Sequence, residues 1–322
     1  YNSVRQHLIE GIWMRKLILF AALLLLAFSP ATNADIDGIP ASASWYFHAD
    51  FDAMRDGKAS RGVYDWLDAE VFAEILGEVG IDFGKEAQSL TAFSGAGAGP
   101  VIILDGKISQ DTRDKVVALA AADGELQTFK SSGKAYYFFD GKANGNKKGK
   151  SGNIDIDIDS LEKEAYVSVA LKNKILITNT QEQMKELLAN DGKVKLERED
   201  KNALFVLRAE RSLIQAGVKA DEMEEGGDWD SKILRNTKQV AVLMADLGEK
   251  LGIEAQLVAN EPDMANSLAS VVRGLIGLTA FNDDMDSEIA AILQSTTVNV
   301  AGNVLKLSLS IDPDTVVSAL AD

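Results

Sequence analysis

The chain contains no cysteine, and its 322 residues include only two histidines, His7 and His48. Without cysteine the protein forms no disulfide, so its core alone must hold it together, which is compatible with the bacterial periplasm. Thiolate metal ligands are absent too. Because zinc prefers nitrogen and sulfur ligands, the single histidine beyond residue 34 leaves almost no means of building a zinc site.

Positive charge is also scarce. The chain has 33 basic and 49 acidic residues, a formal net charge of −16. So acidic a surface repels nucleic acid and anionic membranes and mainly promotes solubility. We therefore expect no nucleic-acid partner.

Long apolar runs are missing except near the N-terminus. Leu17–Phe28 is an unbroken run of 12 residues that follows the basic Arg15-Lys16 and precedes small residues ending at Ala34. A membrane-spanning helix needs roughly 20 residues, whereas this order is typical of a secretory signal peptide. We predict a signal peptide within residues 1–34, with cleavage after Ala34. Residues 1–13 are either upstream translated sequence or an extended basic region of the signal.

The predicted mature chain begins at residue 35 and has a net charge of −18, since residues 1–34 carry three basic side chains and one acidic one. No cysteine lies at the cleavage site, so we expect no lipid anchor and no stable membrane anchor. The predicted location is the periplasm or the medium. At 288 residues, the mature chain is long enough for one large domain or two ordinary ones.

A unit of two strands and a helix is clearest between residues 165 and 192. Val167, Val169 and Leu171 alternate with small or polar residues, and Lys172-Asn173 predicts a tight turn into a second strand. Thr180 with Gln183 three residues later matches a capping box. The helix that follows presents one apolar stripe and ends at Asp191-Gly192; the stripe consists of Met184, Leu187 and Leu188.

Comparable units recur along the chain. The last unit consists of a strand at 297–301, a turn at Gly302-Asn303, a second strand at 304–311, and a helix that begins at Pro313. The charged stretch 191–202 interrupts the series, and the pattern restarts after it. We predict an α+β protein of two related domains, 35–192 and 200–322, as an internal repeat. Each is built from antiparallel hairpins followed by capped amphipathic helices packed on one sheet face.

Catalytic motifs are lacking. Asp50 lies two residues from His48 and would share its strand face, so a hydrolase using this pair, or a pair of carboxylates, is one hypothesis. A histidine hydrogen-bonded near a sheet edge is the favoured interpretation. Gly95–Gly99 lacks the spacing of a phosphate-binding loop and leads into a strand, which favours a hairpin loop.

Three other clusters are candidate binding sites. Asn153, Asp155, Asp157 and Glu164 have the spacing of calcium-loop ligands, but Ile158 stands where such a loop needs glycine, and the alternation of the segment favours an exposed strand. The acids between 283 and 288 suit a solvated helix start. The basic patch suits a solvated loop, with contact to an acidic partner or a phosphate group as the alternative; it consists of Lys142, Lys147, Lys148 and Lys150.

The recurring hairpin and helix segments resemble those of uncharacterised exported bacterial proteins of unknown function. The segments concerned are 101–106, 136–140, and 174–180 before 184–188. This resemblance is architectural and implies no activity and no catalytic residue.

The resulting prediction is an exported, soluble, non-catalytic protein that binds a protein or small-molecule partner, or acts as a scaffold, in the bacterial envelope. We assign no catalytic, cofactor-binding or metal-binding residue and expect no cofactor. A periplasmic hydrolase and a calcium-stabilised envelope protein are the alternatives.

Overall fold

The structure is a computed structural model that describes residues 43–95, 99–122, 126–140, 164–194, 203–210, 236–279, 292–293 and 295–321. The signal segment, the basic patch around Lys142 and the acids between 283 and 288 lie outside the described residues. So do the calcium-loop positions before Glu164. No helix among the described residues is long and apolar enough to cross a membrane.

Both halves of the chain contain strands and helices. In the first half they are β1 (Ala43–Asp50), α2 (Phe51–Asp56), α3 (Arg61–Leu67), η1 (Asp68–Phe72), α4 (Ala73–Val79), α5 (Phe83–Glu86), β2 (Ala87–Gly95), β3 (Val101–Gly106), α6 (Gln110–Ala122), β4 (Gln127–Ser131), β5 (Lys134–Asp140), β6 (Glu164–Ser168), β7 (Lys174–Thr178) and α8 (Gln181–Ala189). In the second half they are β8 (Ala203–Glu210), β9 (Thr237–Asp246), β10 (Leu251–Ala259), α12 (Pro262–Thr279), β11 (Thr297–Ala301), β12 (Val304–Ile311) and α14 (Pro313–Ala321).

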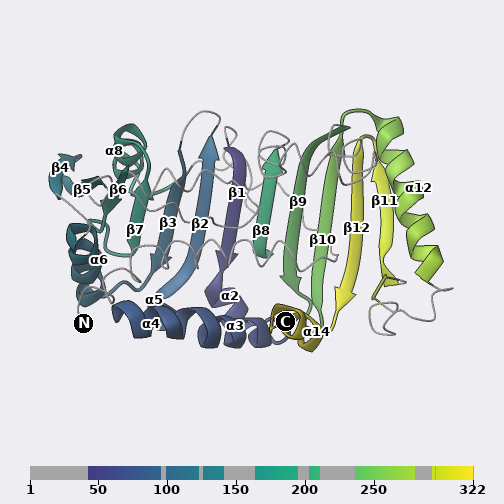
Figure 1. The fold of residues 1–322 in the computed structure, drawn as a ribbon, viewed down its shortest axis with the longest axis horizontal. Coiled ribbons are helices and arrows are strands. Elements are labelled where there is room, and N and C mark those ends of the chain that lie inside the picture. The colour runs from purple at the N-terminus through teal and green to yellow at the C-terminus, as the bar shows by residue number, and fades with distance from the viewer. Residues whose placement is uncertain are drawn as a thin grey trace, which may run out of the picture.

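All the described strands join one twelve-stranded antiparallel sheet (Figure 1). Its order is β11-β12-β10-β9-β8-β1-β2-β3-β7-β6-β5-β4. The predicted α+β class is confirmed. The seam between the two halves is the pairing of β1 with β8, in which Phe47 lies opposite Leu207 and Ala49 opposite Phe205.

The two halves share a strand order. Outward from the seam, the first half runs β1-β2-β3-β7-β6 and the second runs β8-β9-β10-β12-β11. In each half a helix, α6 or α12, follows the third strand along the chain. The β4–β5 hairpin extends the outer edge of the first half alone. This correspondence is what a structural repeat predicts, and the division into two domains stays a prediction.

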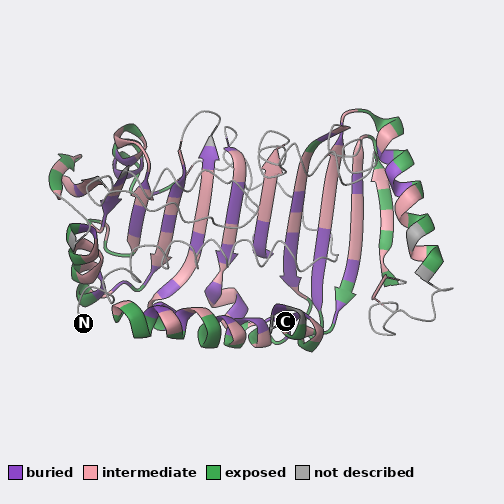
Figure 2. Ribbon diagram, in the orientation of Figure 1, coloured by how far each residue is buried: buried purple, intermediate pink, exposed green. Residues whose placement is uncertain are grey.

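The main core lies between one end of the strands and a row of helices that crosses them. In Figure 1, α3, η1 and α4 run across the lower strand ends, and Figure 2 shows buried residues concentrated in that region. Cross-strand partners share a sheet face, so pairing assigns each residue to one of two faces. We call the face carrying Phe47 and Leu207 face A, and the face carrying His48 and Arg208 face B.

The helices are distributed over both faces. Leu268 and Ala269 of α12 pack near Leu257 and Leu305 of face A, at one end of the sheet. At the other end, Met184, Leu187 and Leu188 of α8 pack near Val101 and Ile103 of face B. On face A, α12 covers one end of the sheet, and the row of α3, η1 and α4 crosses the lower strand ends (Figure 1).

The unit at 165–192 forms largely as predicted. Thr180 and Gln183 make the capping box, and the predicted apolar stripe of α8 is buried. The preceding strand is shorter than the alternation indicates, since β6 ends at Ser168. The Ser168 hydroxyl donates to Ala135 O at 2.7 Å and accepts from Ala170 N at 3.3 Å. These side-chain bonds replace strand pairing, so Val169 leaves the ladder.

The closing unit also matches its prediction. β11 and β12 have the predicted bounds, and Gly302 of the intervening turn has a φ of +60°, a conformation that glycine adopts without a steric penalty. Pro313 begins α14.

Candidate functional site

His48 lies on β1 in face B and contacts Thr91 of β2. Its Nδ1 is 2.9 Å from the Thr91 hydroxyl oxygen. Asp50, the acid next to it on the same face, is used elsewhere, because its Oδ1 accepts from Ala53 N at 2.8 Å and caps α2. The structure therefore places His48 in a sheet hydrogen bond, and Asp50 in a helix cap. No serine contacts His48 through a described hydrogen bond.

Burial lowers the pKa of His48, and the charges of Asp50 and Asp105 oppose this without cancelling it. The folded protein therefore keeps His48 neutral at pH values below its unfolded-state pKa of about 6.5. Its stabilising contribution is complete above that value and is lost as pH falls through the folded pKa. We expect urea unfolding to show lower stability at about pH 5 than at about pH 7.5. The variant His48→Gln keeps a hydrogen-bonding group and should show a smaller pH dependence; an unchanged dependence would assign the effect to other groups.

The most extensive candidate feature is a row of side chains that crosses face A perpendicular to the strands. Successive cross-strand pairs connect eleven residues in register. We call this set the apolar row: Tyr137, Val167, Ile177, Ile102, Ala92, Phe47, Leu207, Val242, Ala255, Leu307 and Val298. Only Phe47 and Val167 are fully buried, while the other nine are partly exposed.

Apart from the Tyr137 hydroxyl, the apolar row has no polar side-chain atom. Most residues of a sheet face either pack fully in a core or alternate with polar groups at the surface. Members of the apolar row also pack against the main core or against α12, and the apolar atoms that the row leaves partly exposed are of the kind found at binding sites.

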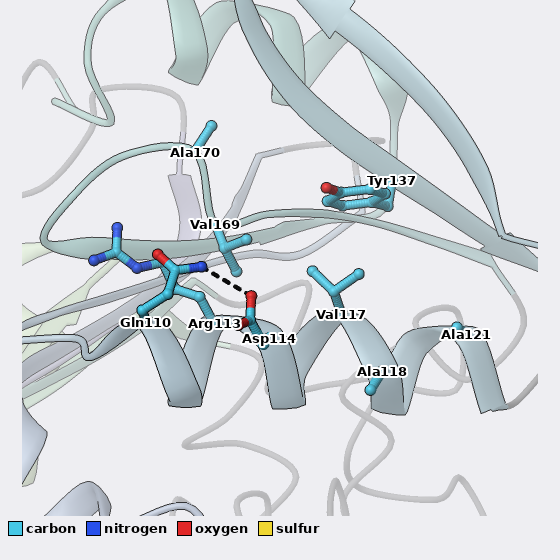
Figure 3. Close-up of a pocket in the computed structure, with 9 residues that line it drawn as sticks. All are labelled: Gln110, Arg113, Asp114, Val117, Ala118, Ala121, Tyr137, Val169 and Ala170. Carbon is cyan, nitrogen blue, oxygen red and sulfur yellow. Dashed lines mark hydrogen bonds between the residues drawn. The ribbon is translucent and has the colours of Figure 1, made fainter.

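The apolar row ends in a groove between α6 and the edge of the sheet (Figure 3). The groove has a volume of about 490 Å³, within the range of small-molecule sites. Its lining residues are Gln110, Arg113, Asp114, Val117, Ala118, Ala121, Tyr137, Val169 and Ala170. Tyr137 belongs to both features, so the row and the groove form one surface.

The groove has a polar end and an apolar end. At the start of α6, Gln110 Nε2 donates to Asp114 Oδ1 at 2.8 Å, and Arg113 Nη2 donates to Ile108 O at 2.9 Å. These bonds hold both side chains near the first turns of α6. Farther along the helix, the groove is lined by Val117, Ala118 and Ala121 (Figure 3). The arrangement suits an amphipathic ligand.

Metal binding has no support among the described residues, where no group of three or more histidine and acidic side chains is placed to hold an ion. Of the predicted calcium-loop positions, only Glu164 is described, and it begins β6. The strands on either side of Gly95–Gly99, β2 and β3, pair with each other, and residues 96–98 between them lie outside the described residues.

The alternation of side chains within each strand predicted which positions are apolar, but it did not predict that these positions line up across the sheet as the apolar row. That row exists only through register between strands, including β1 and β8, whose partners Phe47 and Leu207 are 160 residues apart in sequence. Val117 and Ala120 lie three residues apart on α6, at a spacing that places both on one side of a helix. In the structure Ala120 is buried, whereas Val117 lines the groove.

No protein-family model and no curated protein matches this chain. Solved structures of the Treponema protein TP0453 are similar at low level. Crystal form III has a TM-score of 0.44 and 10% identity, covering 89% of this chain and 98% of that one. Crystal form I has a TM-score of 0.42 and 10% identity, covering 90% and 98%. The chain thus has a weak resemblance to a bacterial protein.

Proposed function

We propose that this is an exported, non-catalytic binding protein of the bacterial envelope, which holds an elongated amphipathic molecule in the α6 groove and along the apolar row. The proposal depends on one observation, that the α6 groove and the apolar row share Tyr137 and so adjoin each other. A partly exposed apolar floor leads into a groove whose far end is polar. Burial of apolar surface, which stabilises a complex by about 25 cal/mol per Å², would drive such binding.

The arrangement around His48 supports binding rather than catalysis. A hydrolytic site needs a base within hydrogen-bond reach of a nucleophile, and an acid or amide that orients the base. His48 contacts only the threonine hydroxyl in its described hydrogen bonds, and Asp50 is committed to capping α2. The alternative hydrolase would require both groups to leave these bonds.

A fluorescent amphipathic probe tests the proposal. We expect 1-anilinonaphthalene-8-sulfonate to bind the purified mature protein with increased emission. The double variant Ala118→Phe/Ala121→Phe fills the apolar end of the groove and should weaken binding at least tenfold, about 1.4 kcal/mol. Both alanines are exposed on α6, so circular dichroism should show an unchanged fold.

The matched control is Leu278→Ser, which removes an apolar side chain that is 63% exposed on α12, away from the groove. It should leave probe affinity within twofold of the parent protein. Equal affinity in the filled-groove variant, or loss of binding in the control alone, would contradict the proposed site.

A further inference from the structure

The two outer strands of the sheet differ in how they are protected. Among the described strands, β4 and β11 each have a neighbour on one side only. β4 carries the exposed Lys130, and a lysine on an edge strand is one of the means by which proteins keep their sheets from pairing with one another. β11 has the sequence TVNVA, without a charged residue or a proline, and its register against β12 has no bulge. The β11 edge therefore lacks the usual protection.

Hydrogen bonding across β12 shows which backbone groups of β11 point outward. Ala259 N donates to Asn303 O at 2.8 Å, so Asn303 and every second residue after it along β12 bond to β10. The alternating residues, which include Ser308, bond to β11. Because β11 and β12 pair in register, Val298 and Val300 are left with their N–H and C=O groups directed away from the sheet.

A contact from α12 agrees with this orientation and shows that the edge can be reached. Arg273 Nη2 donates to Val298 O at 2.7 Å, although α12 packs on face A of β11 and is no part of the ladder. The carbonyl oxygen keeps a second lone pair. Gly277 lies four residues after Arg273, on the same side of the helix, and a Cβ there would meet no described atom within 4 Å outside the helix backbone. This side of α12 therefore leaves the edge open.

The outward groups of β11 are complementary to those of a second copy. In an antiparallel pair about a two-fold axis at Asn299, Val298 of one copy lies opposite Val300 of the other. The N–H and C=O groups of these valines then bond to each other in both directions. The valine side chains lie on face A in both copies, so apolar groups meet there, while the two Asn299 amides meet on the opposite face.

We propose that two copies of this chain associate through β11 into a symmetric dimer, in which the sheet continues across the two-fold axis. An uncharged strand suits a second copy, because chains with a net charge of −16 repel each other over the rest of their surfaces. The same patch is used by both copies, so the assembly closes at two. The outer edges that remain are those of β4, where Lys130 opposes further pairing.

Sedimentation equilibrium of the mature protein tests the proposal. We expect a monomer–dimer equilibrium with a Kd of about 10–100 μM, since the interface is small. Val300→Pro removes an outward N–H that the single chain does not use, so the fold should remain by circular dichroism and the dimer should be lost. Asn299→Lys places two positive charges opposite each other and should weaken the dimer by about tenfold or more. The matched control, Thr128→Lys, adds the same charge to the β4 edge and should change the Kd by less than about twofold.

Cysteine cross-linking tests the register, because the chain has no cysteine of its own. In the proposed pair the Cα atoms of the two Asn299 residues lie about 4.5 Å apart, within the range that a disulfide spans. Under mild oxidation, Asn299→Cys should form a covalent dimer about tenfold faster than Thr128→Cys on the β4 edge.

Three results would each overturn the proposal. They are a parent chain that stays monomeric at about ten times the upper expected Kd, a dimer that both β11 variants leave intact, and equal cross-linking rates for the two cysteine variants. The α6 groove lies at the other end of the sheet, beside β5, so Val300→Pro should leave probe binding unchanged. The groove and the dimer are therefore tested independently.

Discussion

Phe205→Ala should lower the free energy of unfolding by about 4 kcal/mol, the largest effect expected of any single substitution considered for this protein. Phe205 is 3% exposed and packs edge to face against Phe47, with ring centroids 5.3 Å apart. The two rings come from β8 and β1, the strands that form the seam between the halves. Truncation therefore removes a large apolar surface and leaves a cavity at the junction.

Urea unfolding followed by fluorescence and circular dichroism measures this loss and also tests the predicted domains. If 35–192 and 200–322 unfold as separate units, weakening the seam should split the unfolding curve into two transitions. If the sheet is one cooperative unit, a single transition moves to lower urea. Phe205→Leu, which keeps most of the packing, should cost only about 1 kcal/mol. A loss below about 1 kcal/mol for the alanine variant would show that the seam does not stabilise the fold.

Asp246→Ala should cost about 3 kcal/mol, because one carboxylate organises the start of α3 from across the seam. Asp246 Oδ2 accepts from Ala59 N, Ser60 N and the Ser60 hydroxyl, each at 2.9 Å. Ala59 and Ser60 are buried, so their N–H groups would lose an acceptor that water cannot readily replace. Thermal or urea unfolding of the variant measures the loss.

The same contacts give Asp246 a pH signature. Burial raises its pKa, but hydrogen bonds from the N–H groups of Ser60, Gly248 and Ala59 and from the Ser60 hydroxyl outweigh this and lower it. Its contribution to stability is therefore present above the unfolded value near 3.8 and is lost as pH falls through the lower folded value. The parent and Asp246→Ala stabilities should converge in acid.

The control for Asp246 is Asp65→Ala. Asp65 pairs with Arg61 at 2.9 Å, but both side chains are more than half exposed. Surface ion pairs of this kind contribute about 0–1 kcal/mol. Equal losses for Asp65→Ala and Asp246→Ala would contradict the structural role assigned to Asp246.

Features set by residues close in sequence were predictable. The capping box at Thr180, the Gly302-Asn303 turn and the start of α14 at Pro313 depend on hydrogen bonds and backbone preferences within a few residues. Alternating side chains likewise predicted most strands. Composition, for its part, excluded disulfides and left almost no nitrogen or sulfur ligands for zinc.

Contacts between distant residues were not predictable in the same way. Gly57 illustrates this, because a Cβ there would clash with Ser60 Oγ and also with Asp246 Oδ2, a carboxylate on a strand far along the chain. Part of its requirement for glycine therefore comes from a residue distant in sequence. The sequence places Asp50 beside His48 on one strand face, but the path of the backbone into α2 makes the Asp50 side chain a helix cap.

The sequence by itself determined the α+β class, the individual strands and helices, and the apolar positions within them, because these follow from local periodicity and capping. Tertiary structure alone decided that β1 pairs with β8 and that the apolar positions align into one row. Strand register is fixed by pairing between residues far apart in sequence, and side-chain alternation carries no information about which strand will be the neighbour.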